Sequence, residues 1–165
     1  MKRVLFVCTG NIFRSLTAEH ALRHALQGRA DIDVSSAGTD HFAHVVRPNV
    51  REYLRLKGFD VSTHQRRTLT EAMLRDTHLV IAMSTDHRHY IRSRFGHPAA
   101  LFLEACGEAG EVLPDIEEVV LDYQTNRAGV DAHVRATIDR IVSLTPRLAG
   151  RLDALLDRDY ISRTP

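Results

Sequence analysis

The sequence predicts an α/β fold, in which a four-stranded parallel sheet carries helices on both faces. Short apolar runs alternate along the chain with longer amphipathic stretches, a pattern typical of strands joined by crossover helices. The first apolar run, residues 4–7, leads through a short glycine-containing loop directly into a helical stretch. A chain of 165 residues suits one domain, and neither an internal repeat nor a linker-like segment divides it. We therefore expect a single doubly wound domain over residues 1–165.

The expected elements follow from the apolar pattern in chain order. Strands are expected where short apolar runs lie between turn residues, at 3–7, 32–35, 78–83 and 100–103. Helices are expected where apolar residues recur at helical spacing, at 15–27, 48–57, 70–75, 85–94 and 130–156. Pro146 lies inside the last helix and should kink or split it, because proline lacks the N–H group and crowds the preceding turn. Residues 104–129 contain glycines and acidic residues, and should form a long loop at the carboxyl edge of the sheet.

Composition excludes several classes of protein. The formal net charge of +1 gives no general attraction to nucleic acid. The two cysteines, Cys8 and Cys106, are far apart and form neither a zinc-binding pattern nor a disulfide framework, which favours a reducing cytoplasm. No segment approaches the roughly 20 apolar residues of a membrane span, and the amino terminus lacks a cleavable signal. We expect a cytoplasmic protein with no membrane or nucleic-acid partner and no cofactor; the oligomeric state is left open.

The loop from Cys8 to Ser15 has the features of a phosphate-binding site that contains a nucleophile. It lies between the carboxyl end of a strand and the start of a helix, where unpaired backbone N–H groups and the helix dipole attract an anion. Gly10 permits a tight turn, and Asn11 tolerates a positive φ better than most residues. Arg14 can donate two parallel hydrogen bonds to a dianion. The same donors favour the thiolate form of Cys8.

This loop resembles the signature of the low-molecular-weight protein tyrosine phosphatases, Val-Cys-x-Gly-Asn-x-Cys-Arg-Ser-Pro. Three further stretches resemble the same family: Ser-Ala-Gly-Thr at 36–39, Ser-x-His-x-x-Arg-x-Leu-Thr at 62–70, and a strand ending in methionine at 79–84. The similarity is clear over residues 1–105 and looser beyond. Two residues depart from the signature: Phe13 stands at the place of the second cysteine, and Leu16 at the place of the proline.

The resemblance implies a phosphomonoesterase that acts on a phosphotyrosine protein or an aryl phosphate through a phosphocysteine intermediate. It assigns attack to Cys8 and phosphate binding to residues 9–15, namely Thr9, Gly10, Asn11, Ile12, Phe13, Arg14 and Ser15. It also implies that Ser36 and His64 join Asn11 and Ser15 in a hydrogen-bonding network that holds the loop in shape. Family members with isoleucine at the position of Ile12 resemble tyrosine phosphatases, whereas threonine is typical of arginine phosphatases and serine of arsenate reductases.

The sequence offers two candidates for the general acid. A carboxylic acid that protonates the leaving oxygen contributes roughly 10²–10⁴-fold to the rate. The acid of the family is an aspartate followed by proline, and this chain has no Asp-Pro pair. Asp115 has the expected position when counted forward from the fourth strand, and Asp122, beside Tyr123, when counted back from the last helix. We favour Asp115 and keep Asp122 as the alternative.

Two other functions remain open. An arsenate reductase would share the loop but needs further thiols to pass electrons, and Cys106 is the only other cysteine. A phosphate- or phosphoprotein-binding module without turnover would explain the missing Asp-Pro.

The ten histidines suggest no metal site. His20 and His24 share a helix face, but no further ligand completes a set. His87 and His89, two residues apart on a helix, are expected to be solvated.

Overall fold

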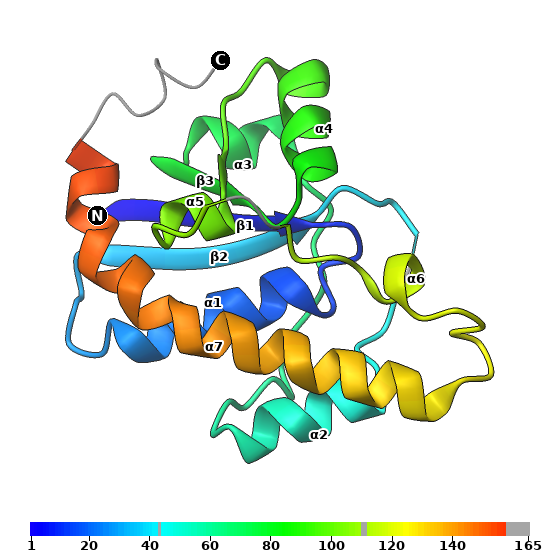
Figure 1. Cartoon of the computed structure of the whole chain (residues 1–165). Coiled ribbons are helices and arrows are strands. Elements are labelled where there is room, and N and C mark those ends of the chain that lie inside the picture. Colours follow the sequence, from blue (N-terminus) through cyan, green and yellow to red (C-terminus); the bar gives the residue numbers. More distant parts are fainter. Residues whose placement is uncertain (43, 110–111, 158–165) are drawn as a thin grey trace.

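The computed structural model describes residues 1–42, 44–109 and 112–157. A four-stranded parallel sheet in the order β2-β1-β3-β4 forms its centre, as the sequence predicts (Figure 1). The strands are β1 (Lys2–Cys8), β2 (Ile32–Gly38), β3 (Leu79–Ala82) and β4 (Ala100–Leu101). The chain moves from β1 to one neighbour and later to the other, so the two halves of the sheet diverge at the carboxyl end of β1. Ligands of open α/β sheets bind at such a point.

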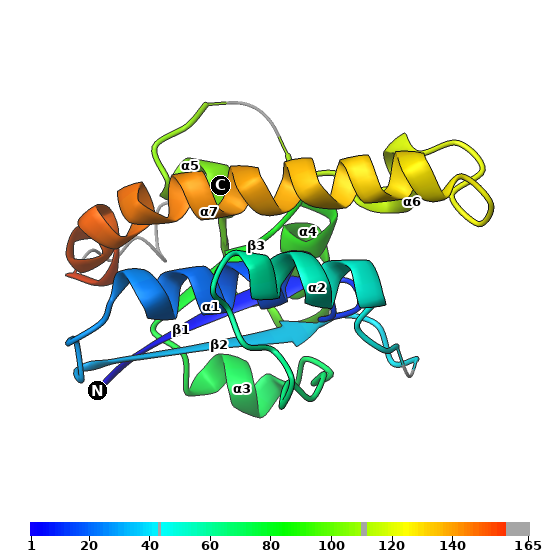
Figure 2. The same ribbon diagram turned by 90° about the horizontal axis from the view of Figure 1, so that it is seen from below.

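Helices cover both faces of this sheet (Figures 1 and 2). On one face α1 (Arg14–Ala25) packs against β1 and β2, and the long α7 (Arg127–Asp157) packs against α1. The nine-residue α2 (Pro48–Leu56) lies on the outer side of this layer, in contact with α7. The opposite face carries α3 (Glu71–Arg75) and α4 (Thr85–Phe95). Two short helices, α5 (Phe102–Ala105) and α6 (Ile116–Val119), lie between β4 and α7 in the chain.

Alternate side chains of β1 belong to different cores. Val4, Phe6 and Cys8 pack with residues of α1, α5 and α7, whereas Leu5 and Val7 pack with residues of α3 and α4. This division follows from the two-residue repeat of a strand. Residues 4–8 of β1 are buried, so Cys8 is fixed at the end of a strand that is enclosed on both faces.

The fourth strand is shorter than expected. Residues 102–103 were predicted as strand but begin α5, and β4 contains only Ala100 and Leu101. A Glu104 carboxylate oxygen accepts a hydrogen bond from the backbone N–H of Leu101, 3.2 Å away, and so helps to start the helix. Phe102 and Leu103 are buried in either conformation, so the apolar run alone did not separate strand from helix.

The segment predicted as one long loop, 104–129, also contains regular structure. It includes the end of α5, all of α6 and the start of α7. Residues 110–111 of this segment lie outside the described part of the chain. The last helix is continuous from Arg127 to Asp157, so Pro146 does not split it. Leu144, Thr145 and Leu148 are buried around the proline, and their packing offsets the missing backbone hydrogen bond. The single domain over 1–165 stays a prediction, since residues 158–165 lie outside the described chain.

Candidate active site

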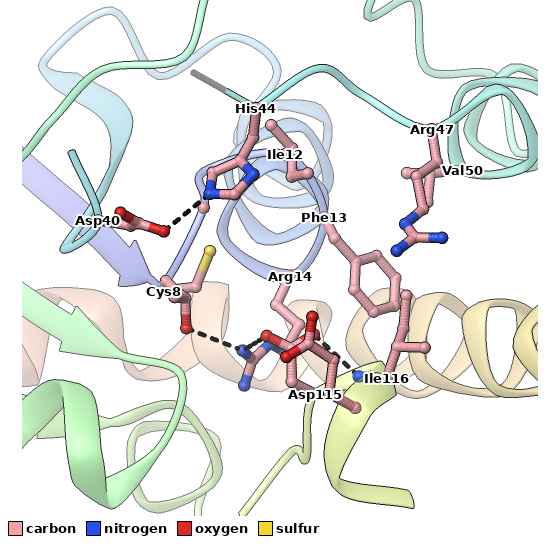
Figure 3. Close-up of a pocket in the computed structure, with 13 residues that line it drawn as sticks. Cys8, Ile12, Phe13, Arg14, Asp40, His44, Arg47, Val50, Asp115 and Ile116 are labelled. Carbon is pink, nitrogen blue, oxygen red and sulfur yellow. Dashed lines mark hydrogen bonds and ion pairs between the residues drawn. The ribbon is translucent and has the colours of Figure 1, made fainter. Parts of the chain in front are cut away.

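The loop between β1 and α1 surrounds the sulfur of Cys8 with polar groups. Cys8 ends β1 and is 3% exposed, and its Sγ shares a 2.9 Å hydrogen bond with the hydroxyl of Ser15 in the first turn of α1. Cys8, Arg14 and every loop residue between them except the buried Asn11 line one pocket (Figure 3). A nucleophile at this place faces the amino-terminal end of a helix, where unpaired N–H groups and the helix dipole stabilise negative charge.

Asn11 ties the loop to three other segments. Its backbone has a left-handed φ of 57°, a conformation that asparagine tolerates. Its side-chain amide donates to the hydroxyls of Ser15 and Ser36, at 3.1 and 2.7 Å, and accepts from the backbone N–H of Arg67 at 2.9 Å. His64 Nε2 donates to the backbone carbonyl of Asn11 at 2.8 Å. The structure thus brings together the four residues that the resemblance placed in a network.

Glu19 extends this network, and the sequence analysis missed it. Its buried carboxylate accepts a hydrogen bond from the hydroxyl of Ser36 and pairs with Arg23 at 2.9 Å and Arg67 at 3.9 Å. Glu19 follows Ser15 by four residues and therefore shares its helix face. That spacing was the available signal, but only the fold shows that this face is buried against β2.

Gly38 allows β2 to approach the loop closely. A Cβ atom at this position would lie 2.5 Å from the backbone oxygen of Thr9 and 3.1 Å from the nitrogen of Asn11. The backbone of the next residue, Thr39, donates to the carbonyl of Cys8 at 2.9 Å. Only glycine fits at this crossing, because a side chain there would separate β2 from the loop.

Arg14 joins the loop to the segment that carries Asp115. Its side chain is 2% exposed; one guanidinium nitrogen donates to the carbonyl of Leu113 at 2.9 Å, and the other pairs with the carboxylate of Asp115. Asp115 also caps α6, accepting from the backbone N–H of Ile116 at 2.9 Å. Asp115 thereby lines the same pocket as Cys8.

Asp122 lies elsewhere. It is exposed, its φ of 56° is left-handed, and its backbone carbonyl accepts from Thr125 and Asn126 in a turn before α7. It is not among the described residues that line the pocket with Cys8. Of the two candidate acids, the structure brings only Asp115 to the loop.

His87 is buried, so the expectation that it is solvated was wrong. It is 5% exposed, and its Nε2 lies 2.9 Å from the hydroxyl of Thr9, while its Nδ1 lies 2.8 Å from that of Ser84. Burial lowers the pKa of His87 to about 4, with a further lowering by the nearby Arg14 that Asp115 opposes. A neutral imidazole therefore supports Thr9 from behind the loop. His89, two residues on, is exposed as expected.

Apolar side chains form much of the pocket wall. Ile12, Phe13, Val50 and Ile116 line it together with polar residues from outside the loop: Asp40, His44, Arg47, Asp115 and Glu117. His44 lies over Gly10, and its Nε2 is 2.7 Å from the carboxylate of Asp40 (Figure 3). That hydrogen bond lowers the pKa of Asp40. If a phosphoryl group were bound at Cys8, the organic group attached to it would lie between these apolar side chains.

Cys106 is fully buried, and burial raises the pKa of its thiol to about 12. Both cysteines are free. Among the described residues, no cluster of three or more His, Cys, Asp or Glu side chains is placed to hold a metal ion. Within the same ranges, every helix is too short or too polar to cross a bilayer.

Fold and site together define a class: doubly wound α/β proteins with a cysteine and an arginine in the loop between the first strand and the first helix. The sequence profile of the low molecular weight phosphotyrosine protein phosphatases matches residues 3–154. The chain belongs to this family.

Curated relatives include proteins with this family's name and arsenate reductases. A probable low molecular weight protein-tyrosine-phosphatase, EpsP of Ralstonia nicotianae, is 34% identical over 100 residues, which cover 60% of this chain and 66% of that protein. The match thus spans just under two thirds of the relative. An arsenate reductase of Staphylococcus aureus is 32% identical over 85 residues, 52% of this chain and 62% of the relative.

Solved structures agree over nearly the whole fold. The YwlE arginine phosphatase, as a cysteine-to-serine mutant with a phosphorylated active-site serine, has a TM-score of 0.78 at 25% identity and covers 95% of this chain and 98% of its own. The low molecular weight protein tyrosine phosphatase of T. tengcongensis has a TM-score of 0.75 at 25% identity. The match covers 92% of this chain and 99% of that chain.

Proposed function

We propose that this protein is a phosphomonoesterase that hydrolyses phosphotyrosine in proteins through a phosphocysteine intermediate. One observation carries the proposal: Cys8, Arg14 and Asp115, which come from two distant segments, line the same pocket. A nucleophile, an anion-binding cation and a proton donor are the three groups that such a reaction needs. We further propose that Thr9 to Ser15 bind the phosphoryl group and that Ser36 and His64 hold the loop through Asn11.

In the first step the Cys8 thiolate attacks phosphorus, an S–P bond forms, and the bond to the leaving oxygen breaks. Asp115 gives its proton to that oxygen, so a neutral phenol leaves. In the second step Asp115 takes a proton from water, whose oxygen attacks phosphorus and displaces the Cys8 thiolate, releasing inorganic phosphate. Arg14 and the loop N–H groups hold the phosphoryl oxygens throughout. Arg14 therefore has to exchange its contact with Asp115 for one with phosphate.

The pocket wall supports an aryl substrate. Ile12, Phe13 and Ile116 offer apolar surface to a flat ring, and Ile12 is the residue that the resemblance associates with tyrosine phosphatases. Arsenate reduction has less support, because the second thiol, Cys106, is fully buried and its pKa is raised to about 12. The two free cysteines also support our proposal that the protein works in a reducing cytoplasm.

Hydrolysis of p-nitrophenyl phosphate and of a phosphotyrosine peptide, in the presence of EDTA, tests the proposal. The wild type should turn over both, and Cys8→Ser and Arg14→Ala should each lose at least about 10³-fold in kcat. Cys106→Ala is the matched control and should retain wild-type rates, because Cys106 lies outside the pocket. Full activity in Cys8→Ser would refute the mechanism. Faster turnover of a phosphoarginine peptide than of the phosphotyrosine peptide would refute the substrate.

A further inference from the structure

A second hollow adjoins the catalytic pocket. Arg47 lines both of them, and the second continues between the start of α2 and the start of α7. We call it the arginine groove and define it by Arg47, Pro48, Asn49, Tyr123, Arg127 and Asp131. In Figure 3 the guanidinium of Arg47 points inward, toward Phe13. A substrate segment that places its phosphotyrosine on Cys8 can therefore extend past Arg47 into the groove.

The groove has a positive charge that the protein does not neutralise. Arg47 is half-buried and Arg127 is exposed, and neither has an ion-pair or side-chain hydrogen-bond partner among the described residues. The acidic residue of the groove, Asp131, accepts a 2.6 Å hydrogen bond from the side-chain amide of Asn49. Most other arginines of the described chain are paired, for example Arg29 with Asp31 and Asp153. Two free guanidinium groups beside one carboxylate leave a net cationic surface.

The positions of these arginines are unfavourable for the helices that they flank. Arg47 is the residue immediately before α2, and Arg127 is the first residue of α7. Neither helix has an acidic residue in its first turn. Helix amino termini favour negative charge, so a cation there opposes the helix dipole. The helix dipoles therefore do not favour these two positive charges, whereas an anionic ligand in the groove would be held by both arginines.

We propose that the arginine groove binds an acidic side chain next to the phosphotyrosine of the substrate. This inference rests on the proposed function and deepens it, since it names the substrate class as phosphotyrosine segments with a flanking aspartate or glutamate. Guanidinium groups bind carboxylates through paired hydrogen bonds, and the half-buried ring of Tyr123 supplies apolar surface for the aliphatic part of the ligand. The site is open to solvent, so its effect should weaken with salt.

The test compares phosphotyrosine peptides that carry glutamate at neighbouring positions, before or after the phosphotyrosine, with peptides that carry glutamine there. For the wild type at low ionic strength we expect kcat/KM to favour at least one glutamate series about five- to tenfold, and the preference to shrink at 0.5 M salt. Arg127→Glu should reverse this preference and leave hydrolysis of p-nitrophenyl phosphate within twofold, because Arg127 lies outside the catalytic pocket. Arg47→Gln should reduce the glutamate-to-glutamine ratio.

The matched control is Arg94→Glu, which makes the same change in net charge on α4, on the opposite face of the sheet. It should keep the wild-type ratio. The proposed role of the groove would be refuted if the wild type turned over all peptides without a preference for glutamate, or if Arg127→Glu and Arg94→Glu had equal effects. Either result would leave the proposed function standing. Absence of turnover with every substrate would overturn both.

Discussion

The buried His87 should make the stability of this protein fall as the pH drops below 6.5. The pKa of His87 falls from 6.5 to about 4 on folding, chiefly through burial. Between these values the unfolded chain binds a proton at this residue and the folded chain does not, so acid favours unfolding. Each pKa unit corresponds to about 1.4 kcal/mol. We therefore expect His87 to lower the free energy of unfolding by about 2 kcal/mol between pH 8 and pH 5, and by about 3 kcal/mol between pH 8 and pH 4.

Urea denaturation from pH 8 to pH 5 measures this effect as a difference between variants. His87→Gln can still bond the hydroxyl of Thr9, but it does not titrate. Its free energy of unfolding should change with pH by about 2 kcal/mol less than that of the wild type. His89→Gln, an exposed position on the same helix, should keep the wild-type pH dependence. If His87→Gln and the wild type lose the same stability between pH 8 and pH 5, the reasoning from burial is wrong.

Three further predictions concern the site and its support. Asp115→Asn should slow phenyl phosphates roughly 10²–10⁴-fold, most for basic leaving groups, whereas Asp122→Asn should stay within twofold; equal slowing of both in a kcat series would contradict the assignment. Gly38→Ala should cost about 1–3 kcal/mol of stability, because its Cβ meets the phosphate loop; an unchanged urea midpoint would contradict that contact. Iodoacetate at pH 7.5 should modify Cys8, with protection by phosphate, and leave Cys106 intact; labelling of Cys106 in the native protein, seen by mass spectrometry, would contradict its burial.

Local pattern was enough for the part of the site that is continuous in sequence. The apolar run before Cys8, the turn residues Gly10 and Asn11, and the helical stretch after Arg14 each determine their own conformation, so strand, loop and helix were predictable. The end of the fourth strand was not, because Phe102 is buried in either a strand or a helix. The choice there depends on the carboxylate of Glu104, which caps α5.

Partners from distant segments set the rest of the site. His87 follows Ser84 by three residues at the start of α4, but its other hydrogen-bond partner, Thr9, is 78 residues away. Asp115 matches the position of the family's acid when counted forward from the fourth strand, and Asp122 matches it when counted back from the last helix. Spacing alone could not choose between them. The path of the chain around α6 decides which of them reaches Arg14.

The most direct test of the account is to trap the covalent intermediate. Wild-type protein mixed rapidly with p-nitrophenyl phosphate should release a burst of about one nitrophenol per chain if breakdown of the intermediate is slower than its formation. Denaturation during that burst, followed by mass spectrometry, should find one phosphoryl group on Cys8 and none in Cys8→Ala. A phosphoryl group on another residue, or turnover that persists in Cys8→Ala, would contradict thiolate attack by Cys8.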